Sequence, residues 1–131
     1  MEDLIREYIA RFPKETNAID VLDFFKNSGS IRENDFNGHF TGSAWVLNPF
    51  KDRVLMTHHK KLGMWLQLGG HSNGETDLYK VALREAKEES GIQKIIGLSN
   101  NIFDLDIHII PEQIDQPSHK HYDIRFLFEA N

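Results

Sequence analysis

A segment with a helical pattern, bounded by glycines at both ends, constrains the fold of this chain more than any other stretch. It spans residues 69–92 and reads GGHSNGETDLYKVALREAKEESGI. Its apolar residues recur at helical spacing, which predicts a helix over residues 77–90 with one face packed on a sheet. Thr76 or Asp77 is expected to cap the N-terminus, and Gly91 is expected to end the helix. The apolar positions are Leu78, Val81, Ala82 and Ala86.

Three carboxylates lie on this predicted helix at positions i, i+3 and i+4, namely Glu85, Glu88 and Glu89. That spacing places them on one face, where their like charges repel. A bound cation relieves the repulsion, and carboxylate oxygens suit Mg²⁺ or Mn²⁺. Since Mg²⁺ is usually shared with substrate phosphates, a phosphate-bearing substrate is indicated. The alternative from composition alone is a solvated acidic helix face.

The same segment resembles the Nudix box, whose pattern is G-x5-E-x7-R-E-U-x-E-E-x-G-U, with U an aliphatic residue. Starting at Gly70, the spacing places Thr76 where the family usually has glutamate, with Glu75 and Asp77 on either side. In the family this glutamate mostly braces the motif arginine, here Arg84. We therefore expect Glu75 or Asp77 to take over the brace. The other motif positions match without insertion or deletion and are Arg84, Glu85, Ala86, Glu88, Glu89, Gly91 and Ile92.

The resemblance implies Mg²⁺- or Mn²⁺-dependent hydrolysis of a pyrophosphate bond in a nucleoside diphosphate linked to another moiety. By carry-over, the metal ligands are expected to be Glu85, Glu88, Glu89 and the carbonyl of Gly70. Either Glu85 or Glu89 could act as the base that deprotonates the attacking water. Candidate substrate contacts are His71, directly after the two glycines, together with Arg84 and His121.

The last of these candidates, His121, belongs to a second constellation. His119, His121 and Asp123 alternate along an extended segment, so their side chains share one face. Such a group could bind a transition metal or contact phosphate. A polar strand edge at the surface is the alternative.

Helical and strand patterns divide the chain into two regions. Amphipathic helices are expected over residues 2–12 and 19–25, and strand patterns follow from residue 39 onward. This indicates an α+β fold, with residues 40–47 and 53–58 expected to form a hairpin and Trp45 and Trp65 expected in the core.

The resemblance extends over roughly residues 39–129 and implies a Nudix-type α/β/α sandwich with a mixed sheet. Residues 1–37 then form an N-terminal helical lead-in, expected to cap the domain, with a substrate lid or a dimer contact as alternatives. Residues 38–131 form the Nudix hydrolase domain. Since family domains continue with another strand and a C-terminal helix, we expect that helix to be absent and the chain to be C-terminally truncated, or another chain to cover the sheet.

Composition argues against several classes of protein. The net charge of −5 argues against a stable nucleic-acid complex, and no stretch is long and apolar enough for a membrane span. The chain has no cysteine, which fits a cytoplasmic protein and excludes thiolate zinc sites. It also weighs against an isopentenyl diphosphate isomerase-like enzyme, which relies on a cysteine. A non-catalytic Nudix-like nucleotide-binding module usually loses motif glutamates. We therefore expect a small-molecule nucleotide-type substrate, and a homodimer is left open.

Overall fold

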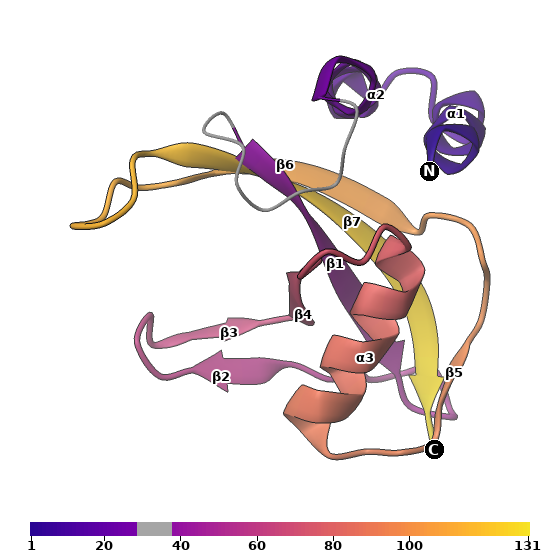
Figure 1. Ribbon diagram of the computed structural model, residues 1–131. Coiled ribbons are helices and arrows are strands. Elements are labelled where there is room, and N and C mark those ends of the chain that lie inside the picture. The colour runs from indigo at the N-terminus through magenta and orange to yellow at the C-terminus, as the bar shows by residue number, and fades with distance from the viewer. Residues whose placement is uncertain (29–37) are drawn as a thin grey trace.

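The computed structural model describes residues 1–28 and 38–131, and Figure 1 shows the arrangement of its helices and strands. In chain order the elements are α1 (Glu2–Arg11), α2 (Thr16–Ser28), β1 (Gly38–Leu47), β2 (Thr57–His59), β3 (Met64–Leu66), β4 (Leu68–His71), α3 (Leu78–Ser90), β5 (Ile95–Gly97), β6 (Asp104–Ile110) and β7 (His119–Ala130). No helix in this described part of the chain is long and apolar enough to cross a membrane.

The main sheet is built around β1 and β7, which run parallel from the pair Gly38–Lys120 to the pair Leu47–Glu129. Strand β4 pairs antiparallel with the other edge of β1. The second edge of β7 is shared, because β6 pairs with its first half and β5 with its last residues, both antiparallel. The sheet is therefore mixed. Strands β2 and β3 form a separate two-stranded ribbon.

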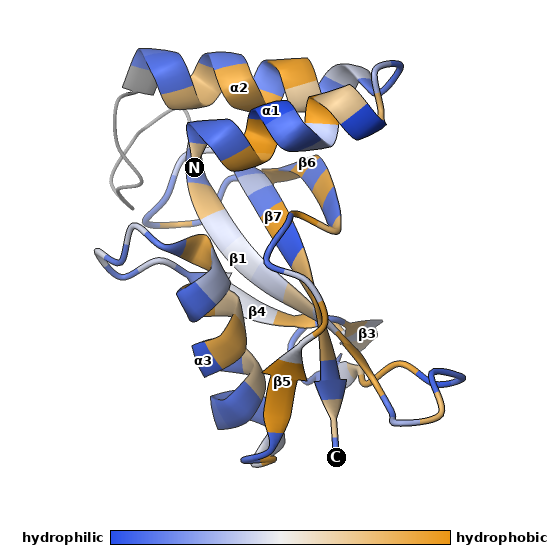
Figure 2. Cartoon of the chain, turned by 90° about the vertical axis from the view of Figure 1, so that its right-hand side faces the viewer, coloured by the Kyte–Doolittle hydropathy of each residue, from blue (hydrophilic) through white to orange (hydrophobic). Residues whose placement is uncertain are grey.

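One face of this sheet is apolar and packs against the helices. Figure 2 shows the hydropathy of each residue along the helices and strands. Helix α3 lies directly over β1 at Gly42, where a Cβ atom would come within 2.7 Å of the carbonyl oxygen of Leu78. Glycine at this position therefore allows the close approach of helix and strand. Alternate residues of the central strands and the inner stripe of α3 are buried together, namely Phe40, Ala44, Val46, Ile124, Phe126, Phe128, Leu78, Val81, Ala82 and Ala86.

The N-terminal helices pack on the same face. The ring of Phe24 in α2 stacks on Tyr122 of β7 with centroids 3.9 Å apart, and it lies 5.3 Å from the ring of Phe40. Phe40 and Gly42 are two residues apart in β1, so they face the same side of the sheet. Helices α2 and α3 therefore cover neighbouring parts of one face, and α1 joins this core through Ile5 and Tyr8.

The predicted α+β class, the mixed sheet and the N-terminal helical lead-in are confirmed. The predicted end of the lead-in at residue 37 falls within residues 29–37, which lie outside the described part of the chain.

The predicted hairpin between residues 40–47 and 53–58 is confirmed only next to its turn, where Leu47 and Val54 form an antiparallel bridge and the N–H of Leu55 donates to the carbonyl of Val46. Farther along β1 the edges are taken by β4 and β7. Trp65, expected in the core, is 65% exposed because it lies on the separate β2–β3 ribbon.

The contact between α2 and the sheet can be tested with Phe24→Ala. Removing the ring leaves a void beside Tyr122 and Phe40, and we expect the free energy of unfolding to fall by about 2 kcal/mol, since Phe24 is only partly buried. Phe50→Ala is the matched control, because Phe50 is 86% exposed and its loss should change stability by less than about 0.5 kcal/mol. Urea denaturation measures both. Equal effects of the two substitutions would contradict the packing of α2.

Candidate functional site

Helix α3 begins and ends where its sequence signals place it. The carboxylate of Asp77 accepts hydrogen bonds from the backbone N–H groups of Tyr79 (3.1 Å) and Lys80 (3.4 Å). Gly91 ends the helix with φ 74°, and its N–H donates to the carbonyl of Lys87. The predicted helix is confirmed, with Asp77 rather than Thr76 as its cap.

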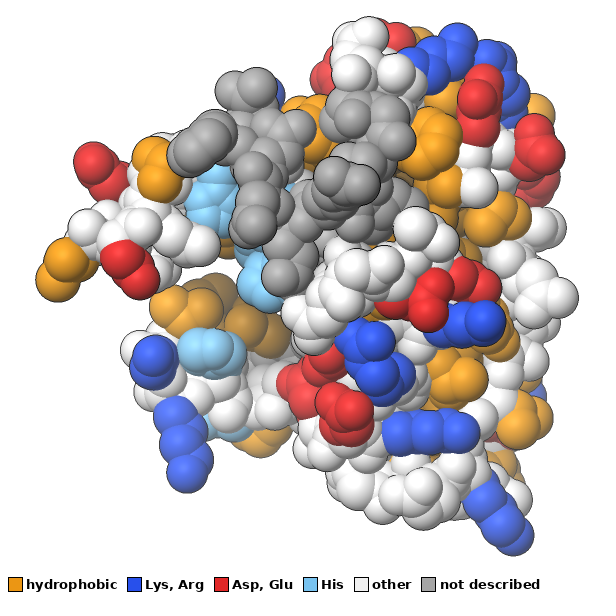
Figure 3. Space-filling view, in the orientation of Figure 1, with side chains coloured by type: hydrophobic (Ala, Val, Ile, Leu, Met, Phe, Trp, Pro, Cys, Tyr) orange, Lys and Arg blue, Asp and Glu red, His pale blue; other side chains and the backbone are white. Residues whose placement is uncertain are grey.

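The helix brings two of its carboxylates against the glycine pair of β4. The N–H of Gly69 donates to Oε1 of Glu89 at 3.0 Å. A Cβ atom on Gly70 would lie 2.7 Å from Cδ of Glu85, so only glycine leaves room for this carboxylate. Glu88 lies on the same side of the helix and is exposed. Acidic and basic side chains gather over α3 in Figure 3.

The surroundings of Glu89 disfavour its charged form. Partial burial against the β4 backbone raises the pKa of this carboxyl, and the nearby charges of Glu85 and Glu88 raise it further. The hydrogen bond from Gly69 opposes this shift without cancelling it. The carboxyl of Glu89 is therefore protonated more easily than an ordinary glutamate in water.

Arg84 is held differently from the sequence-based expectation. Its guanidinium donates from Nη2 to the carbonyl oxygen of His71 at 3.2 Å and to Oε1 of Glu85 at 3.4 Å. Asp77 is engaged as the helix cap, and Glu75 accepts a hydrogen bond from the N–H of Asp77, which lowers the pKa of Glu75. Arg84 is thus held by a backbone carbonyl and a motif glutamate, and not by Glu75 or Asp77 as expected.

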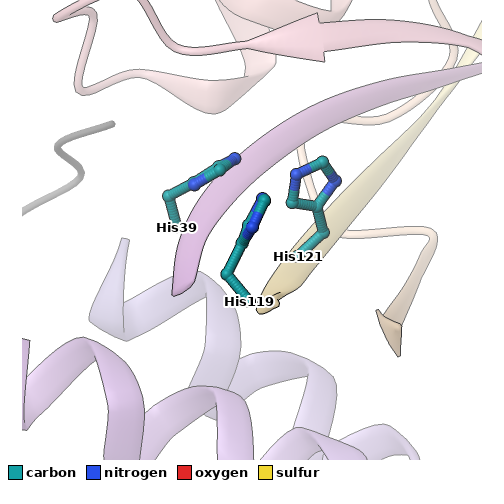
Figure 4. A group of neighbouring side chains, drawn as sticks. All are labelled: His39, His119 and His121. Atoms are coloured by element: carbon teal, nitrogen blue, oxygen red, sulfur yellow. The ribbon is translucent and has the colours of Figure 1, made fainter. Parts of the chain in front are cut away.

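A group of five histidines lies on the opposite, polar side of the sheet. His39 of β1 is the register partner of His121 in β7, and their ring centroids are 4.4 Å apart. The ring of His119 lies 5.0 Å from that of His39. His71 and His108 complete the group, with centroids 5.3 Å and 5.2 Å from that of His121. Figure 4 shows His39, His119 and His121 beside the neighbouring ends of β1 and β7.

His39 and His108 are the members that sequence reasoning missed, and His39 is the more central of the two. The available signal was the alternation of His39, Thr41 and Ser43 with apolar residues in β1, which marks a polar face. Nothing in that pattern predicts the parallel pairing with β7.

Asp123 shares its face with His119 and His121 as predicted, but its carboxylate serves a different set of partners. It accepts hydrogen bonds from the hydroxyl groups of Thr41 (2.8 Å) and Ser43 (2.6 Å). It also accepts from Nε of Arg125 at 3.0 Å and from Nε2 of Gln67 at 3.2 Å. Asp123 is 3% exposed, and these donors satisfy its buried charge. It belongs to the structural network of the sheet.

His121 is neutral in this environment. Burial, together with the neighbouring histidines among which a further positive charge is unfavourable, lowers its pKa to about 3. The three predicted substrate contacts fall in two places. Arg84 lies beside Glu85 of α3 and donates to the backbone carbonyl of His71. The rings of His71 and His121 lie together on the polar face, with centroids 5.3 Å apart.

Comparisons with known proteins give little further information. No family model matches the chain, and no curated protein matches it. Among solved structures, the crystal structure of the C. elegans Ap4A hydrolase matches 67% of this chain and 67% of its own, with 16% identity and a TM-score of 0.44. The functional assignment therefore depends on the residues of the site.

The low pKa of His121 predicts that acid destabilises the protein. The unfolded chain takes up a proton on this residue near pH 6.5 and the folded protein only near pH 3, so stability falls as the pH decreases between these values. We expect the melting temperature of His121→Asn to fall less between pH 7 and pH 4 than that of the unsubstituted protein. His58→Asn, at an exposed position, should keep the original slope. Parallel slopes for all three proteins would contradict the assignment.

Proposed function

We propose that this protein is a Nudix-type hydrolase that cleaves a pyrophosphate bond in a nucleoside diphosphate linked to another moiety. The observation that carries the proposal is the placement of Glu85 and Glu89 against Gly70 and Gly69, at the spacing of the Nudix box. On this proposal residues 38–131 form the catalytic domain and residues 1–37 its helical lead-in. The protein acts in the cytoplasm on a small nucleotide-type molecule.

The donor set of α3 fits a hard divalent cation, Mg²⁺ or Mn²⁺. Glu85, Glu88 and Glu89 supply carboxylate oxygens, and the backbone carbonyl of Gly70 is an additional oxygen ligand. The space left at Gly70 is occupied by the carboxylate of Glu85, which brings this side chain to the same backbone segment as Glu89. A cation held there polarises phosphoryl oxygens and lowers the pKa of a bound water.

Between the two candidate bases, the surroundings favour Glu89. The carboxylate of Glu85 already has a partner, since its Oε1 lies 3.4 Å from Nη2 of Arg84. Glu89 has a raised pKa, and a carboxylate whose pKa is nearer to neutrality accepts a proton from water more readily. We therefore assign Glu89 as the base, which leaves Glu88 and Glu85, the latter oriented by Arg84, as the carboxylate ligands of the metal.

We assign Arg84 and His71 as contacts to the substrate. The Arg84 side chain is 37% exposed, so part of its guanidinium remains accessible for the oxygens of a phosphate. Its bond to the carbonyl of His71 fixes the start of the loop that follows β4. The ring of His71 is exposed and lies with that of His121 on the polar face of the sheet.

Substitution of the motif glutamates tests the reaction. A panel of nucleotide sugars, dinucleoside polyphosphates, oxidised nucleotides, NADH and ADP-ribose, assayed with Mg²⁺ and Mn²⁺, should contain a hydrolysed compound. Glu88→Gln and Glu89→Gln should each lower kcat/KM for it by about 100-fold or more. Glu112→Gln, in the exposed β6–β7 loop, is the matched control and should retain full activity. Unchanged activity in both motif variants would refute the site, and nucleotide binding without hydrolysis would favour a binding module.

Gly70→Ala tests the close approach of Glu85 to β4. The added Cβ atom must displace this carboxylate, so we expect activity to fall by at least about tenfold while the protein remains folded. Gly74→Ala is the comparison, since a Cβ atom there meets no atom within 4 Å although φ is +87°. Its backbone strain lowers the melting temperature without moving Glu85. Loss of activity in Gly74→Ala alone would contradict the role of Gly70.

A further inference from the structure

A compact donor group lies on the polar face of the sheet, away from the carboxylates of α3. One ring nitrogen from each of His39, His119 and His121 can be chosen so that all three lie within 4.8 Å of one another. Among the residues that the structure describes, no other group of three or more histidine, aspartate or glutamate side chains brings its ligand atoms this close together. We propose that these three histidines bind a divalent transition metal of the zinc type, at a site separate from that of the motif glutamates.

The backbone holds two of the three ligands in place. His39 and His121 face each other in the parallel β1–β7 pair, and His39 is only 6% exposed. In a tetrahedral zinc site with Zn–N distances of about 2.1 Å, ligand nitrogens lie roughly 3.4 Å apart. Side-chain rotations that shorten the present separations by at most about 1.4 Å therefore complete the site. No rearrangement of the strands is needed.

The third ligand is oriented by a backbone group. Nδ1 of His119 lies 3.0 Å from the carbonyl oxygen of Pro117, to which its N–H donates. This hydrogen bond fixes the tautomer and leaves the lone pair on Nε2. Metal-binding histidines in proteins are commonly held by such an outer contact on the second ring nitrogen.

The donor chemistry separates this site from that of α3. Imidazole nitrogen suits Zn²⁺, Co²⁺, Ni²⁺ and Cu²⁺, whereas Mg²⁺ and Mn²⁺ favour the carboxylate oxygens of the helix. The nearest buried carboxylate, that of Asp123, is occupied by Thr41, Ser43 and Arg125. Three imidazoles leave a fourth position for water or for His71, whose ring centroid is 4.7 Å from that of His39.

Titration of the metal-free protein with Co²⁺, without nucleotide, tests the proposal. Tetrahedral Co²⁺ has visible absorption bands, and we expect them to saturate at one equivalent and to disappear when Zn²⁺ displaces it. Mg²⁺ should not displace it. His119 is partly exposed, and His119→Gln should weaken Co²⁺ binding by more than about 100-fold. Loss of a residue that only hydrogen-bonds to a ligand already lowers metal affinity roughly 10- to 100-fold, and loss of a ligand itself should lower it more. The exposed control His58→Gln should bind Co²⁺ like the unsubstituted protein.

Two further variants make the outcome decisive. His121→Gln repeats the test at a second ligand, with circular dichroism to verify folding of each variant. Glu89→Gln should retain the Co²⁺ spectrum even if hydrolysis is lost, which separates this site from the proposed active site. The proposal is overturned if no Co²⁺ spectrum develops, if both histidine variants bind normally, or if Glu89→Gln abolishes the spectrum.

Discussion

The parallel pairing of β1 with β7 is the constraint on which the rest of the structure depends. Its register places Phe40 beside Tyr122 on one face and His39 beside His121 on the other. Because side chains alternate along a strand, one register assigns every residue of both strands to a face. A shift by one residue would turn the aromatic rings away from α2 and α3. The apolar core and the histidine group are therefore specified together.

The polar face is stabilised by a buried charge with several partners. A carboxylate removed from water is costly unless hydrogen bonds replace its hydration. Asp123 receives two hydroxyl groups from β1 and one guanidinium N–H from Arg125, which also reaches Asp104 of β6 at 2.8 Å. Three neighbouring strands are thereby connected on the side opposite the helices. The face needs this network because no helix of the described residues covers it.

The sequence predicts well what local interactions determine. Helix α3 follows from its apolar period, the capping side chain of Asp77 and the left-handed conformation of Gly91. Its spacing also predicts which carboxylates lie together. Pairing between remote strands was not predicted, as with β1 and β7 and hence with His39, because register between strands far apart in the chain leaves no local signal. The partner of Arg84 is a backbone carbonyl, which any residue at position 71 would provide, so residue types could not reveal it.

The parallel pair also has a kinetic consequence. The hydroxyl of Thr41 and the carboxylate of Asp123 are 82 positions apart along the chain, so β1 has no partner at this edge until a long loop has closed. Closing a loop of that length costs about 4 kcal/mol of chain entropy before any stabilising contact forms. Helix α3 and the β6–β7 hairpin are local and form earlier, on the microsecond scale. Docking of β1 is thus expected to be the slow step of folding, during which its apolar face is exposed to association with other chains.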